Sequence, residues 1–85
     1  MVNKVAFEMI YKDLKDKYKK LTISQKELAK ELGISDSSLA SNIKAGINIP
    51  KYRVIGMGEI RQKKVFPLIE VAKFLSDTER VFKNA

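Results

Sequence analysis

The sequence contains neither histidine nor cysteine. The chain therefore lacks the usual zinc ligands, the most common general base and the thiolate nucleophile. Its serines have no imidazole to activate them, and its carboxylates are scattered over the expected helix faces. We expect no catalytic residue, no metal site and no cofactor, and we interpret the protein as a non-enzyme.

Long apolar runs are also missing. Residues 1–21 alternate apolar side chains with lysine, aspartate and glutamate, which is typical of neither a secretion signal nor a membrane span. Without cysteine there can be no disulfide, and nothing indicates export. We expect a cytoplasmic protein without membrane association. Its length of 85 residues suits one small domain, which we expect to span residues 1–85.

Acidic residues are too few to balance the basic ones. The chain has 17 lysines and arginines against 10 acids, for a net charge of +7. Residues 21–50 carry three charges of each sign, whereas residues 51–85 carry eight basic and four acidic groups. A clustered positive charge indicates a polyanionic partner, most often a nucleic acid, although basic surfaces also serve solubility.

Apolar residues at three- and four-residue spacing predict an N-terminal helix from about residue 3 to residue 20, within the segment 1–21. Its main stripe consists of Phe7, Ile10, Tyr11, Leu14, Tyr18 and Leu21. A second, shorter stripe on the opposite side consists of Val2, Val5 and Met9. The second stripe is consistent with a dimer contact, but also with a frayed terminus or a helix buried on both sides.

A second helix is predicted over Gln25–Leu32. Ser24 and Glu27 form a capping-box pattern, in which the serine hydroxyl and the glutamate each accept a hydrogen bond from the other residue's backbone N–H. Gly33 follows the last apolar residue and suits a left-handed C-terminal turn. A short β-prone connector, Leu21–Ile23, precedes this helix.

A third helix, capped by Ser35 or Asp36, is predicted to run to about Lys44. A helix-turn-helix needs a small residue at the helix crossing, a glycine in the turn, an apolar plug and apolar anchors in its second helix. These are Ala29, Gly33, Ile34 and the pair Leu39 and Ile43. Residues 24–45 therefore favour a helix-turn-helix over an ordinary helical hairpin with a glycine corner.

A basic hairpin is predicted over residues 51–66. Ile47–Pro50 is expected to be extended because a residue before proline favours the β region. Strands are expected at Tyr52–Ile55 and Lys64–Phe66, with Gly56–Gly58 beginning the loop between them. The predicted fold is mainly α, a winged helix-turn-helix of about four helices with one two-stranded β-hairpin wing.

A last helix is predicted over residues 67–83. Pro67 suits its first turn, because the fixed φ of proline fits a helix start. Its apolar face consists of Leu68, Val71, Ala72, Leu75 and Phe82. Alternatively, Ser76 with Glu79 could start a separate C-terminal turn.

The region from Ile23 to about Leu75 resembles the small winged helix-turn-helix proteins of the excisionase, AlpA and MerR group. The matching stretches read ISQKELAKELGIS, SNIKAGINIP, YRVIGMGEIRQKKVFP and IEVAKFL. The resemblance implies a recognition helix in the major groove, with a hairpin on the backbone or in the minor groove. One departure is that the exposed positions of the recognition helix are mostly short side chains.

The predicted contacts with double-stranded DNA fall into two sets. The serines, which discriminate weakly among bases, and an asparagine are expected at base edges: Ser37, Ser38, Ser41 and Asn42. The cations are expected at phosphates or in the minor groove, the last four by the resemblance: Lys44, Arg53, Arg61, Lys63 and Lys64.

The predicted role is that of a transcription regulator or an excisionase-like accessory factor, as phage and plasmid genomes use. A single module of this kind covers little DNA. We therefore expect a homodimer or cooperative oligomer, joined through the second stripe or through Val81 and Phe82, with a recombinase or polymerase as a further partner. The alternative is a protein-interaction module, such as an antitoxin or adaptor, whose basic face binds an acidic partner.

Overall fold

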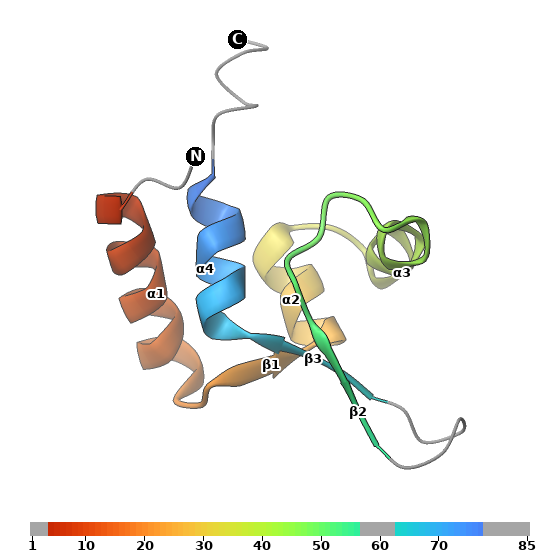
Figure 1. The fold of residues 1–85 in the computed structure, drawn as a ribbon, viewed down its shortest axis with the longest axis horizontal. Helices are drawn as coiled ribbons and strands as arrows, with labels where there is room; N and C mark the ends of the chain where they lie inside the picture. The colour runs from red at the N-terminus through yellow and green to blue at the C-terminus, as the bar shows by residue number, and fades with distance from the viewer. Residues whose placement is uncertain (1–3, 57–62, 78–85) are drawn as a thin grey trace, which may run out of the picture.

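A computed structural model describes residues 4–56 and 63–77 of the chain. Along the chain its elements are α1 (Lys4–Tyr18), β1 (Thr22–Ser24), α2 (Gln25–Leu32), α3 (Asp36–Ala45), β2 (Arg53–Ile55), β3 (Lys63–Pro67) and α4 (Leu68–Ser76). Helices α1 and α4 lie side by side at one end of the molecule, and α3 lies at the other end (Figure 1). The predicted mainly helical winged helix-turn-helix is confirmed.

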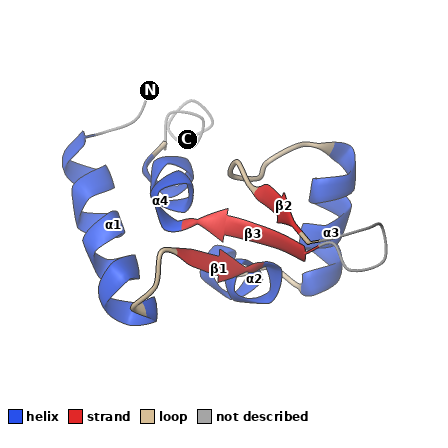
Figure 2. Ribbon diagram, turned by 60° about the horizontal axis from the view of Figure 1, so that its bottom comes forward, coloured by secondary structure: helices blue, strands red, loops and turns tan. Residues whose placement is uncertain are grey.

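The strands form one antiparallel sheet in the order β1-β3-β2. The predicted hairpin, β2 with β3, is present, and a third strand adds to it because the connector before α2 pairs with β3 (Figure 2). Ile23 lies opposite Phe66 in this pairing, and both side chains are fully buried. The burial of Ile23 explains why a connector of only three residues joins the sheet.

The core lies where the sheet meets the helices. Its buried apolar residues are Leu14, Ile23, Leu28, Ala29, Leu39, Phe66, Leu68, Val71 and Ala72. The predicted main stripe of α1 packs against this core through Phe7, Ile10, Tyr11, Leu14 and Tyr18. Leu21 does not belong to the stripe, because the helix ends before Lys19, whose φ is 55°, and the Leu21 side chain is 70% exposed.

Two other local predictions need correction. The segment before Pro50 is not extended throughout, because Asn48 has a φ of 53°, a left-handed conformation that asparagine tolerates. Pro67 does not lie in the first turn of α4: it is the last residue of β3 and the N-cap, with a ψ of 134°. Helix α4 ends at Ser76, earlier than predicted, with Asp77 as its C-cap, and residues 78–83 of the predicted range lie outside the described residues.

The turn between α2 and α3 follows the predicted chemistry. Gly33 has a φ of 70°, where a side chain would add strain. The Ile34 N–H donates to the Ala29 carbonyl at 3.1 Å, and the half-buried Ile34 side chain packs against the core. Ser35 is the N-cap of α3 and accepts a hydrogen bond from the Ser38 N–H at 3.1 Å. The angle between the two helices is thus fixed by local hydrogen bonds and one apolar plug.

The start of α2 has the predicted capping box. The Ser24 hydroxyl accepts a hydrogen bond from the Glu27 N–H at 3.1 Å, and the Glu27 carboxylate accepts one from the Ser24 N–H at 2.9 Å. Lys20 adds an ion pair of 3.0 Å to the same carboxylate. The hydrogen bond from the Ser24 backbone, followed by that from Lys20, lowers the pKa of Glu27 below its usual value of 4.5.

A second carboxylate joins α1 to α2. Glu31 accepts hydrogen bonds from the Tyr18 hydroxyl and the Lys17 ammonium. Burial alone would raise the pKa of Glu31, but these two donors outweigh burial and lower it. Burial and the bond to Glu31 also raise the pKa of the Tyr18 hydroxyl well above its usual value.

We expect the fold to lose stability in acid because of these two carboxyl groups. Their pKa values are lower in the folded chain, so their contribution is complete above pH 4.5 and is lost as the pH falls through the lowered values. The test is urea unfolding between pH 7 and pH 3, comparing the protein with the double variant Glu27→Gln, Glu31→Gln. The amides keep acceptor oxygens, so a shallower decline is expected in the variant, and identical declines would contradict the prediction.

Candidate nucleic-acid interface

Helix α3 is fixed by one face and exposes the other. Leu39 is fully buried, and Ile43, one turn later, packs against the core. The residues at three- and four-residue spacing on the opposite side are all exposed: Ser37, Ala40, Ser41 and Lys44. We call these four residues the α3 stripe. Its surface offers two hydroxyls, one methyl and one ammonium group.

The other two predicted base contacts lie on a different flank of α3. Ser38 and Asn42 are one turn apart, about 100° further around the helix than Ser37 and Ser41. The Ser35 hydroxyl donates to the Ser38 hydroxyl at 2.9 Å and shares a hydrogen bond of 3.2 Å with the Ser37 hydroxyl, so this contact does not distinguish the two serines. Asn42 is half-buried. The structure thus brings Ser37, Ser41 and Lys44 together and separates Ser38 and Asn42 from them.

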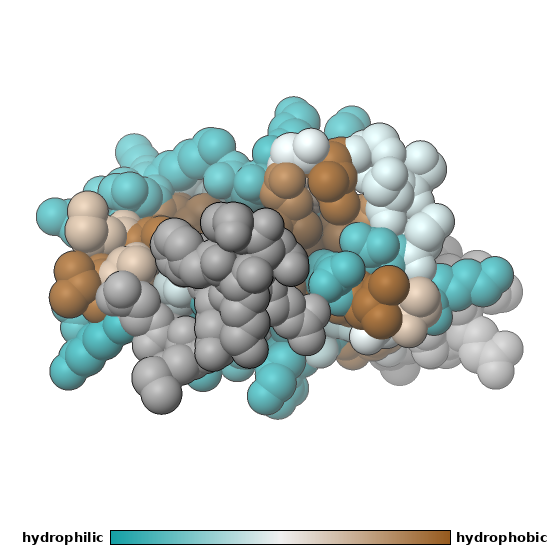
Figure 3. Space-filling view, turned by 90° about the horizontal axis from the view of Figure 1, so that it is seen from above, coloured by the Kyte–Doolittle hydropathy of each residue, from teal (hydrophilic) through white to brown (hydrophobic). Residues whose placement is uncertain are grey.

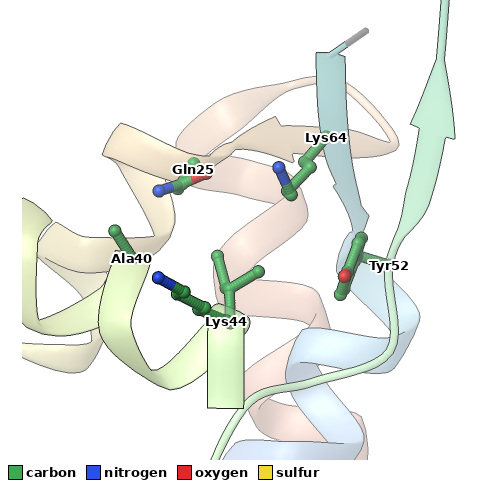
Figure 4. Close-up of a pocket in the computed structure, with 6 residues that line it drawn as sticks. Gln25, Ala40, Lys44, Tyr52 and Lys64 are labelled. Atoms are coloured by element: carbon green, nitrogen blue, oxygen red, sulfur yellow. The ribbon is translucent and has the colours of Figure 1, made fainter. Parts of the chain in front are cut away.

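A groove of about 370 Å³ lies between α3, the start of α2 and the hairpin (Figure 4). Its lining residues are Gln25, Ala40, Ile43, Lys44, Tyr52 and Lys64. Lys44 comes from α3 and Lys64 from β3, so each wall supplies one cation. Within the described residues neither lysine has an ion-pair partner. The groove therefore has a cationic rim over a partly apolar floor.

The floor of the groove is supported by the core. The ring of Tyr52 packs against that of Phe66, with centroids 5.4 Å apart and a tilt of 41°. Gln25 is the first residue of α2, directly after the capping residue Ser24. The contact between the two rings and the capped start of α2 hold the groove in place. Figure 4 shows Lys64 on the side of the groove that faces Gln25.

The predicted wing cations do not share one face. Val54 lies opposite Lys64, while Arg53 lies opposite Val65 and Ile55 opposite Lys63. Side chains alternate between the faces of a strand, and Lys64 is two residues from the buried Phe66. Lys64 thus faces the groove, whereas Arg53 and Lys63 lie on the outer face of the sheet. The predicted contact Arg61 lies outside the described residues.

Four groove residues were not among the predicted contacts, and one of them, Ile43, was predicted as a core anchor of the third helix. Gln25 had a sequence signal, because the residue after an N-cap is at an exposed helix start. Ala40 had one too, since it shares the helical spacing of Ser37 and Lys44. Tyr52 had none, because its position depends on the packing of its ring against Phe66.

The order and geometry of α2, the glycine turn and α3 are those of a helix-turn-helix. Residues 14–55 match the family model described as helix-turn-helix. This match supports a helix-turn-helix DNA-binding protein, and the matched segment extends past the motif through β2. No curated protein and no solved structure matches the chain.

Two other kinds of site are absent from the described part of the chain. Over residues 4–56 and 63–77, acidic side chains do not gather into groups that could hold a metal ion. In the same residues no helix has the length and apolar character required to cross a membrane. The groove and the α3 stripe are therefore the candidate site.

Proposed function

We propose that this protein binds double-stranded DNA with sequence preference and serves as a transcription regulator or an excisionase-like accessory factor, not as an enzyme. The observation that carries the proposal is the groove, which has one lysine from the recognition helix and one from the wing. A DNA strand that follows the edge of the major groove would pass between these two cations. The helix-turn-helix match supports the same assignment.

In this arrangement α3 enters the major groove. Ser37 and Ser41 face base edges, with Ser38 and Asn42 contributing from the flank. Lys44 and Lys64, on the two walls of the protein groove, bind phosphates of the DNA. Serine hydroxyls bond to any base and discriminate weakly, so DNA shape contributes much of the preference.

The outer face of the wing also contacts DNA in this proposal. Arg53 and Lys63 point away from the groove, so they reach phosphates only where the wing enters the minor groove and meets both backbones. Arg61 is assigned to the same minor-groove contact. This arrangement resembles that of the excisionase, AlpA and MerR group, to which we assign the protein.

The same proposal includes a homodimer or a cooperative oligomer on DNA. Val5 and Met9, on the outer side of α1, are 68% and 63% exposed. Apolar surface is visible at the α1 end of the molecule (Figure 3). Val2, Val81 and Phe82, the other residues assigned to this contact, lie outside the described residues. A recombinase or RNA polymerase is the proposed further partner.

The decisive test is the salt dependence of DNA binding. With four to six phosphate contacts, a plot of log affinity against log salt concentration is expected to have a slope of about −4 to −5. Lys64→Ala and Arg61→Ala should each make the slope shallower by about one unit. Fluorescence anisotropy with a labelled random-sequence duplex measures both quantities, and Lys12→Ala on α1 is the matched control.

The slopes of the two variants and the binding at low salt test different parts of the proposal. Unchanged slopes in both variants would remove the wing from the interface. No binding at low salt would overturn the proposed function and favour a protein-interaction module with an acidic partner.

A further inference from the structure

Ala40 is the one apolar member of the α3 stripe. It lies one turn before Lys44 and one position before Ser41, and its side chain is exposed. Its methyl group points into the groove on the side of Gln25 (Figure 4). This methyl group is therefore part of the surface that the proposed DNA would contact.

A methyl group restricts the bases that can lie against it. In the major groove, adenine, guanine and cytosine present hydrogen-bond donors and acceptors, and thymine adds a C5-methyl group. Placing the Ala40 methyl on a donor or acceptor would exclude water without replacing its hydrogen bond, which is unfavourable. Placing it on a thymine methyl removes two apolar surfaces from water.

The neighbours of Ala40 make its position precise enough for this contact. Leu39, the preceding residue, is fully buried and fixes the rotation of α3. Lys44 and Lys64 lie on opposite walls of the groove. Phosphates bound there would fix the depth of α3 in the major groove. The serines of the α3 stripe are tolerant of all four bases, so the methyl is the selective group within the stripe.

We propose that Ala40 reads thymine by contact with its C5-methyl group and is a specificity-determining residue. The inference rests on the proposed DNA-binding function. It predicts that the preferred site contains a thymine at one defined position in each half-site, and that removing one methyl group from the DNA weakens binding.

The experiment begins by selecting preferred duplexes from a random-sequence library with the wild-type protein. Each thymine of the selected duplex is then replaced singly by deoxyuridine, which lacks only the C5-methyl group. At one position in each half-site we expect about fourfold weaker binding, the value of about one buried methyl group. Ala40→Gly should bind the thymine and deoxyuridine duplexes with equal affinity.

Ala45→Gly is the matched control. Ala45 is also exposed and lies in α3, about 140° around the helix from Ala40 and outside the groove lining. Both variants exchange alanine for glycine in the same helix, and comparing two duplexes on one protein cancels any loss of stability. Ala45→Gly should keep the fourfold preference for thymine.

The outcomes separate the two proposals. Tight binding without a deoxyuridine effect at any position would overturn the role of Ala40 and leave DNA binding intact. A deoxyuridine effect that persists in Ala40→Gly would assign the methyl contact to another residue and also overturn the inference. No saturable binding to the starting library would instead overturn the proposed function.

Discussion

Replacing Phe66 with alanine is expected to lower the free energy of unfolding by about 3–5 kcal/mol. Phe66 is fully buried in the central strand β3, lies opposite Ile23 and packs against Tyr52. Its removal leaves a cavity where the sheet meets the helices, and the surrounding elements can close it only in part. Small domains are stable by about 5–15 kcal/mol, so this loss removes a large part of the total.

Urea unfolding followed by circular dichroism measures this change. Val54→Ala is the control, because Val54 is an apolar residue of the adjacent strand but is 51% exposed. Its replacement should change stability by about 0.5 kcal/mol or less. A loss below about 1 kcal/mol for Phe66→Ala would show that the core does not depend on this ring.

The helices could be predicted because their signals are local. The capping box needs only Ser24 and Glu27, three residues apart, and it forms as predicted. Gly33 adopts the left-handed conformation that its place after α2 indicated. Such interactions form within one turn of chain, so the amino-acid pattern alone contains them.

The third strand could not be predicted, because its partner is far away in the sequence. Thr22–Ser24 pairs with a strand more than forty residues later, and only the packing of Ile23 on Phe66 makes that pairing favourable. Leu21 fitted the helical spacing of α1, but a left-handed residue, Lys19, ends the regular geometry before it.

The candidate site also combines features that local spacing indicates with features that depend on the fold. Helical spacing is enough to place Ser37, Ser41 and Lys44 on one stripe of α3, although the prediction grouped the serines with Asn42. It could not show that Lys64 faces that helix while Arg53 lies on the other side of the sheet, because this depends on the β2–β3 register. Charge counting treats these cations as equivalent, whereas the fold assigns them to different faces.

Reversing the charge of the two groove lysines is expected to have a large effect on DNA affinity. The double charge reversal Lys44→Glu, Lys64→Glu is expected to weaken binding by about 100-fold or more, because it places a carboxylate on each wall of the groove beside the proposed phosphates. Both lysines line the groove surface, and within the described residues neither has an ion-pair partner. Their replacement should therefore leave the fold intact, which thermal unfolding can verify.

The control has the same net charge but a different charge distribution. Lys4→Glu with Lys12→Glu reverses two exposed lysines on α1, at the end of the molecule away from α3 (Figure 1). Screening at physiological salt limits the reach of such distant charges to about 8 Å, so binding should weaken only slightly. If both double variants lost affinity equally, overall charge would account for binding, and the groove would have no special part in it. A loss confined to the groove variant would place the DNA strand between α3 and the wing.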